Sequence, residues 1–198
     1  MKRTWRTYGI GIFLISGMLA ALVWASETIE IATYVPAPNS QGVGKLVNRA
    51  YAESNTYQVI PQAIPFGDIV PQITQGKEIL SVTLTPTDSN NRLRMQVTVP
   101  YNVKTEGEVI IVAMFRDSNP GAIAAVVQAP TRQDWDGVVT FAHEMTAGTT
   151  NPVQISVRVG PNGPPSVPGG EVYINGRNSG RLLGGASKAT LIVDEIIP

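Results

Sequence analysis

The sequence predicts an all-β fold, an antiparallel β-sandwich, and three features of the chain support this. Apolar and polar side chains alternate strictly over residues 92–99 and 153–159, which is typical of strands with one face in a core and one in water. Clusters of turn-forming residues separate such segments at short intervals. No interior stretch of useful length shows the apolar period of a helix.

The strands are expected in the following order. Residues 79–85 and 109–115 are nearly all apolar and are expected to be deeply buried, whereas residues 138–145 alternate, and residues 189–197 form a terminal strand. The turns expected between strands are residues 86–91, 117–121, 147–152 and 160–163. Short strands separated by such turns favour a sandwich or a jelly roll.

The first 25 residues have the pattern of a secretory signal peptide. Lys2, Arg3 and Arg6 precede an apolar run, and small residues stand where a signal peptidase would cut, after Ala25. An uncleaved helical membrane anchor through residues 8–25 is the alternative, because the run is about long enough to span a bilayer. We therefore expect an exported protein, extracellular or at the cell surface, with the periplasm as a further location.

Residues 26–56 are expected to form an extended linker or stalk, with the folded domain at residues 57–198. Pro36, Pro38 and a cluster of Asn, Ser and Gly favour a linker. An alternative for residues 44–54 is two helical turns with Leu46, Val47 and Tyr51 on one side.

Composition excludes several classes of function. The chain has no cysteine, so it has neither disulfides nor thiolate chemistry, and its stability must come from its core, from oligomerisation or from both. Without residues 1–25, 12 Lys and Arg stand against 15 Asp and Glu, a net charge of −3. A chain without basic excess is a poor nucleic-acid partner. No motif indicates a cofactor.

Four short motifs carry a resemblance to a known family. They are P-Q-x-T-x-G followed by L-T-P-T, A-x-F-x-D-S, M-T-A-G-T-T, and R-L-x-G-G before the last strand. In this order they resemble a jelly-roll domain found at the C-terminal ends of bacteriophage tail-fibre and other virion proteins, and in some bacterial exported proteins. The resemblance covers residues 57–198. It implies a domain similar to the complement and tumour-necrosis-factor jelly rolls, often trimeric and largely without assigned activity. The proline-rich loop 160–170 departs from the family pattern.

His143 is the only histidine, and Glu144 follows it. Alternation places Phe141, His143 and Met145 on one face of a strand and Glu144 on the other, so His143 and Glu144 are not expected to act on one substrate. The zinc-protease motif needs a helix and a second histidine, and Ala147 stands in its place. We expect Phe141, His143 and Met145 to lie in the core or at an oligomer axis, with no metal.

Asp134, Trp135 and Asp136 are the candidate ligand-binding residues. A tryptophan ring can stack on a sugar while carboxylates accept hydroxyl hydrogen bonds. Calcium needs about six to eight oxygen ligands, more than this segment supplies. The simpler alternative is a turn whose tryptophan packs on the edge of the sandwich. The glycines at 180 and 185 have the spacing of a phosphate loop, but Ala186 replaces the required lysine, so they are interpreted as structural.

These observations predict a non-enzymatic, exported structural or attachment protein. Its domain is expected to form a homotrimer and to present loops, among them residues 134–136 and 160–170, to a surface glycan or protein. No catalytic residue is assigned. Two alternatives stay open: a monomeric carbohydrate-binding module, and a hydrolase on a jelly-roll scaffold.

Overall fold

The computed structural model describes residues 44–104, 107–130, 134–163 and 170–198. All of them belong to one compact unit, Ser40–Pro198. The predicted signal or anchor segment lies outside the described residues. The strands are β1 (Lys45–Ser54), β2 (Gln58–Ile60), β3 (Lys77–Leu84), β4 (Arg92–Val103), β5 (Ile110–Arg116), β6 (Ala124–Gln128), β7 (Trp135–Thr146), β8 (Val153–Pro161), β9 (Val172–Ile174), β10 (Gly176–Arg177), β11 (Gly180–Arg181) and β12 (Ala189–Ile197), with a 3₁₀ turn, Leu183–Gly185, before β12.

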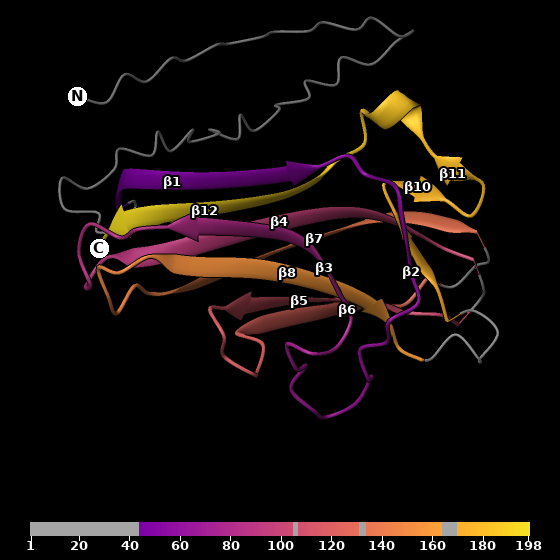
Figure 1. Cartoon of the computed structure of the whole chain (residues 1–198), viewed down its shortest axis with the longest axis horizontal. Helices are drawn as coiled ribbons and strands as arrows, with labels where there is room; N and C mark the ends of the chain where they lie inside the picture. Colours follow the sequence, from indigo (N-terminus) through magenta and orange to yellow (C-terminus); the bar gives the residue numbers. More distant parts are fainter. Residues whose placement is uncertain (1–43, 105–106, 131–133, 164–169) are drawn as a thin grey trace, which may run out of the picture. The chain divides into compact units, whose positions relative to one another are not determined.

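The strands form two main antiparallel sheets, with a small β10–β11 ribbon beside them. In the first sheet the order is β1-β12-β4-β7, and β9 and β2 extend it beside the last residues of β4. The second sheet has the order β3-β8-β5-β6. Figure 1 shows β1, β12 and β4 in one layer and β8, β5 and β6 in the other.

The chain crosses repeatedly between the two sheets. It passes from β3 in the second sheet to β4 in the first, returns for β5 and β6, crosses to β7, and comes back for β8. This strand order is jelly-roll-like. The prediction of an all-β, antiparallel fold is confirmed. In the described part of the chain, no helix is long and apolar enough to cross a membrane.

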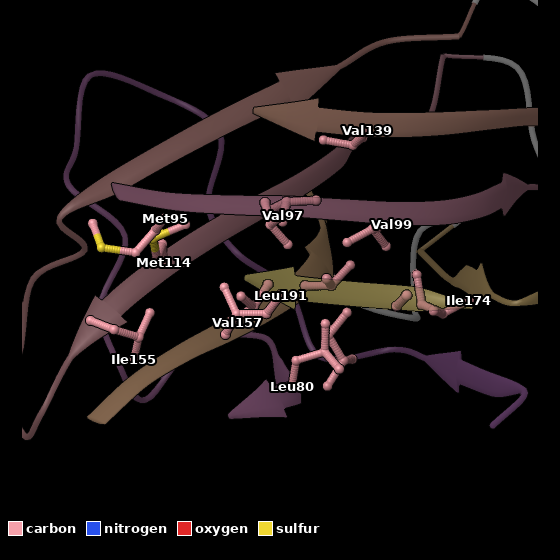
Figure 2. Close-up of a cluster of buried hydrophobic side chains, with 14 of the residues drawn as sticks. Leu80, Met95, Val97, Val99, Met114, Val139, Ile155, Val157, Ile174 and Leu191 are labelled. Atoms are coloured by element: carbon pink, nitrogen blue, oxygen red, sulfur yellow. The ribbon is translucent and has the colours of Figure 1, made fainter. Parts of the chain in front are cut away.

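Alternation in β4 and β8 builds the main core. The β4 side chains of Leu93, Met95, Val97 and Val99 are fully buried, while those between them face outward. Figure 2 shows Val97 and Val99 of β4, Ile155 and Val157 of β8, and Leu191 of β12 in the cluster between the sheets. Each such side chain contributes about 1.5–3 kcal/mol when it leaves water.

β5 is buried on both faces, which explains its nearly continuous apolar sequence. Its inward side chains join the main core, and its outward side chains, Ile111, Ala113 and Phe115, form a second core with Ile64 and Val109. The segment between β2 and β3, residues 61–76, supplies Ile64 and Ile73 and covers this face of β5. The second sheet is therefore covered locally on both sides.

The predicted linker is wrong for residues 45–54. They form β1, which pairs with β12 from Lys45 opposite Ile197 to Ser54 opposite Ala189. Neither the extended stalk nor the two helical turns expected here are found. The inward positions of β1 hold Asn48, Ala50, Ala52 and Ser54, so the strand lacks the large apolar residues by which a half-buried strand is recognised. Residues 26–43 lie outside the described part.

A buried carboxylate joins β12 to the turn before β4. Glu195 has no exposed surface, and its Oε1 accepts hydrogen bonds from Asn91 Nδ2 (2.7 Å), Thr87 N (2.7 Å), Thr87 Oγ1 (2.8 Å) and Asp88 N (3.3 Å). Burial alone would raise the pKa of Glu195, but these hydrogen bonds outweigh burial and lower the pKa below its ordinary value. Glu195 is therefore an anion that holds the 87–91 turn.

Replacing Glu195 with Gln is expected to reduce the free energy of unfolding by about 1.5–3 kcal/mol at pH 7, because hydrogen bonds to a charged acceptor are lost. The folded-state pKa is lowered, so the anion stabilises the fold above the unfolded pKa, about 4.3, and this stabilisation disappears as pH falls through the folded pKa. Urea unfolding between pH 7 and 3 measures the effect. Asp194→Asn, the next position on the outward face, is the control, and an equal loss in both variants would contradict this role.

Candidate functional site

The predicted ligand-binding residues lie where β7 begins, beside the last residues of β4. Trp135 is opposite Val103, and Asp136 is opposite Asn102. Asp134 adopts a left-handed conformation (φ 51°), and its N–H donates to Lys104 O at 3.4 Å. The start of β9 and the β10–β11 ribbon belong to the same end of the first sheet.

Asp136 is bound by two neighbours and is not a free carboxylate. Its Oδ1 accepts from Asn102 Nδ2 (3.0 Å) and from Arg177 Nε (2.9 Å), and its Oδ2 accepts from Arg177 Nε (2.8 Å) and the Arg177 Nη2 group. The hydrogen bond and the charge of Asp136 raise the pKa of Arg177. This pair ties β10 to β7, and its charges compensate each other.

A buried tyrosine continues the same row across the sheet. Tyr173 of β9 lies opposite Asn102, and its hydroxyl lies 3.1 Å from Glu171 Oε2 and 3.2 Å from Asn178 Oδ1. Burial, followed by the hydrogen bond and charge of Glu171, raises the pKa of Tyr173 to about 12. We name Asn102, Asp136, Glu171, Tyr173, Arg177 and Asn178 the sheet-end cluster.

Trp135 lies beside this cluster and is 40% exposed. Successive residues of a strand point to opposite faces, so Trp135 and Asp136 are directed to opposite sides of the first sheet. A sugar stacked on Trp135 would therefore have to take its polar contacts from other groups than the adjacent Asp136. The residues that the sequence reasoning missed are Asn102, Tyr173 and Arg177, which come from three separate segments.

The sheet-end cluster offers polar recognition groups more readily than reactive ones. Among the described residues, no group of three or more His, Asp or Glu is placed to hold a metal ion. A hydrolase would need two carboxylates directed at one hollow, whereas Asp136 is paired with Arg177 and Glu171, the second carboxylate of the cluster, accepts the hydrogen bond of the Tyr173 hydroxyl. Asn102 and Tyr173 are buried, so the groups that the cluster offers to a ligand are those of the exposed Asp136, Arg177 and Asn178, which can hydrogen-bond hydroxyl groups.

The second half of β7 separates the His143–Glu144 pair. Phe141 and Met145 are half-buried and pack against the main core, and His143, also half-buried, lies opposite Met95. Glu144 is on the outer face, where Arg94 Nε donates to it at 3.0 Å and Arg92 Nε also donates. The Arg94 hydrogen bond is the largest cause that lowers the pKa of Glu144.

β7 is also an edge strand. In the described part of the chain it pairs with β4 alone, so its second edge has no strand partner. Exposed apolar side chains lie on β7 and on β6, the edge strand of the second sheet: Trp135, Val138 (55% exposed) and Val127. The opposite edge of the first sheet is β1, where Leu46, Val47 and Tyr51 are exposed. The first sheet therefore has apolar groups at both edges.

Only the ends of the predicted loop at 160–170 belong to the described residues, since residues 164–169 lie outside them. Gly160 and Pro161 end β8 and are buried. A Cβ at Gly160 would lie 2.3 Å from Gln62 O, so glycine is needed where residues 61–64 cross β8. Pro161 O accepts the N–H of Ile64 at 2.8 Å.

Comparisons with known proteins leave the family open. No family model and no curated protein matches the chain. Among solved structures, the chain is similar to a sugar-binding protein described as the EclA C-terminal domain, with 16% identity, a TM-score of 0.32, and coverage of 72% of this chain and 86% of that one. It is also similar to the infectious bursal disease virus Gx strain structure (12%, TM-score 0.38, covering 77% and 38%) and to that virus's VP2 subviral particle (10%, TM-score 0.35, covering 77% and 38%). Scores this low carry no argument about function.

Tyr173 is expected to titrate last among the described tyrosines, near pH 12. Its raised pKa means that the protonated phenol stabilises the fold below the ordinary pKa of about 10, and that this contribution is lost as pH rises through about 12. Absorbance at the phenolate band during alkaline titration measures it. Tyr173→Phe should remove the last step, with Tyr51→Phe as the exposed control. Loss of an earlier step in Tyr173→Phe would contradict the assignment.

Proposed function

We propose that this chain is an exported, non-enzymatic structural or attachment protein whose jelly-roll domain forms a homotrimer and presents its loops for binding. The observation that carries the proposal is the edge of β7 that has no strand partner among the described residues, together with exposed Trp135 and Val138. An uncovered edge strand of twelve residues invites association with further chains, and natural proteins usually cover or blunt such edges. A subunit interface would cover it.

The two edges of the first sheet support a ring in particular. The β7 edge and the β1 edge carry different exposed apolar groups, so the β7 side of one subunit would meet the β1 side of the next. Such head-to-tail contacts close into rings when the rotation between subunits allows it. The number three comes from the resemblance to trimeric jelly rolls. Association would also stabilise a chain that has no disulfides.

The end of the sandwich where β7 begins is the surface proposed for the ligand. This end holds the last residues of β4 and β8 and the first residues of β7 and β9, together with the sheet-end cluster. The ligand class that this end suits is a surface glycan or a polar protein surface, since its exposed side chains, those of Asp136, Arg177 and Asn178, are polar.

The mass in solution tests the trimer. The exported chain is expected at three times the monomer mass in light scattering after gel filtration. Val138→Glu, which puts a charge on the β7 edge, should shift it to monomer with an unchanged circular dichroism spectrum. Leu183→Glu is the control, because Leu183 is 78% exposed on the 3₁₀ turn and belongs to neither β1 nor β7. A monomeric wild type would overturn the proposal.

Exposed Trp135 favours one second candidate, a monomeric carbohydrate-binding module. In that case Trp135→Ala should weaken binding in a glycan array by about tenfold or more, because a stacked ring contributes much of the contact area. The oligomeric state would be the same in both proteins. Glycan binding that survives Trp135→Ala would contradict this candidate.

A further inference from the structure

The segment that covers β5, residues 61–76, has an exposed apolar tip in its middle. We define this tip as residues 65–70, all of which are exposed, with Phe66 at 64%, Ile69 at 66% and Val70 at 56%. Its only charge is Asp68. Figure 1 shows the β2–β3 segment projecting past β5 and β6. Three large apolar side chains gathered on one protruding loop are unusual for a surface exposed only to water.

The base of this loop is held firmly. Ile64 N donates to Pro161 O (2.8 Å) and Gly76 N to Ala63 O (3.1 Å), so the two ends of the loop are joined to each other and to β8. The Arg158 guanidinium donates to Gln75 O (2.8 Å) and Gly76 O (3.0 Å). These bonds fix the end of the loop nearest β3.

The β5–β6 turn holds the other side. Ile73 N donates to Pro120 O (2.8 Å), and Ala122 N donates to Pro71 O (2.9 Å). Ile73 packs with Ile64 in the second core. The tip is therefore presented by a fixed frame, and a partner that receives it would not have to order the loop first.

The size and shape of the tip decide its partner. Three side chains fall well short of the roughly 800 Å² per partner that a stable protein interface buries. A lipid bilayer has no such requirement, because each apolar side chain that leaves water contributes independently. We propose that the apolar tip inserts Phe66, Ile69 and Val70 into the boundary between headgroups and acyl chains of a lipid bilayer.

The depth and the lipid class follow from the polar groups. The irregular backbone of the tip has carbonyl and amide groups that need water or headgroups, so insertion is restricted to the interfacial layer. Residues 61–76 contain Asp68 and no Lys or Arg. The anionic surface of a charged membrane repels this carboxylate, so the tip prefers bilayers with uncharged, zwitterionic headgroups.

A single labelled cysteine tests the insertion. Because the chain has no cysteine, Ile69→Cys can be labelled in the full chain with a polarity-sensitive nitrobenzoxadiazole dye. With phosphatidylcholine vesicles we expect emission to rise and shift to the blue, and a lipid-linked quencher to reduce it. Leu183→Cys, labelled in the same way, is the matched exposed control and is expected to stay unchanged.

Three results overturn the proposal. They are no response at position 69, an equal response at 69 and 183, and emission that the lipid-linked quencher does not reduce. A tip made for an apolar pocket in a protein gives the first result. Attachment of the chain by residues 8–25 alone also gives the first result, because the label at 69 then stays in water.

Two further variants test the role of the apolar side chain Phe66 and the role of the charge of Asp68. With the label at 69, Phe66→Ser should weaken vesicle partition at least tenfold, because burial of one large apolar side chain is lost. Adding phosphatidylserine should weaken partition about fivefold, and Asp68→Asn should remove that dependence. Unchanged partition in Phe66→Ser contradicts the proposal. The trimer is tested separately, because monomeric Val138→Glu still carries the tip.

Discussion

The twelve residues of β4 pair with β7 along one edge and with β12 and then β9 along the other. The inward side chains of β4 form the centre of the main core. On its outward face, Arg94 near one end of β4 pairs with Glu144 of β7. Asn102 near the other end donates a hydrogen bond to Asp136 and so belongs to the sheet-end cluster. β4 is therefore the one strand of the first sheet that pairs directly with three others in the described part of the chain.

The surfaces of the domain differ in what they can do. The middle of the outer face of the first sheet carries ion pairs, Arg49 with Asp194 and both Arg92 and Arg94 with Glu144. Exposed pairs of this kind contribute little to stability. The apolar groups lie elsewhere, at the β1 and β7 edges and on the tip at residues 65–70. Association is thus directed to edges and loops.

The sequence predicted the strands whose inward positions are large and apolar, such as β4 and β8, because alternation is a local signal. It failed at β1, whose inward Ala50 and Ala52 are too small to mark a strand and whose pairing with β12 is long-range. The separation of His143 from Glu144 was foreseen from alternation alone. The Asp136–Arg177 pair was not, because its partners are 41 residues apart in sequence and no local pattern connects them. The cover that residues 61–76 place over β5 was missed for the same reason.

The pairing of β1 with β12 also constrains how the chain can fold. Lys45 lies opposite Ile197, so the first strand of the described domain has no partner in its sheet until the last strand has been synthesised. Glu195, on that same last strand, is needed to hold the 87–91 turn. Folds dominated by such distant contacts form slowly, because the loop must close before any contact rewards it. The sandwich therefore closes only after β12 has left the ribosome, and the emerging chain stays open for longer than one built from local hairpins.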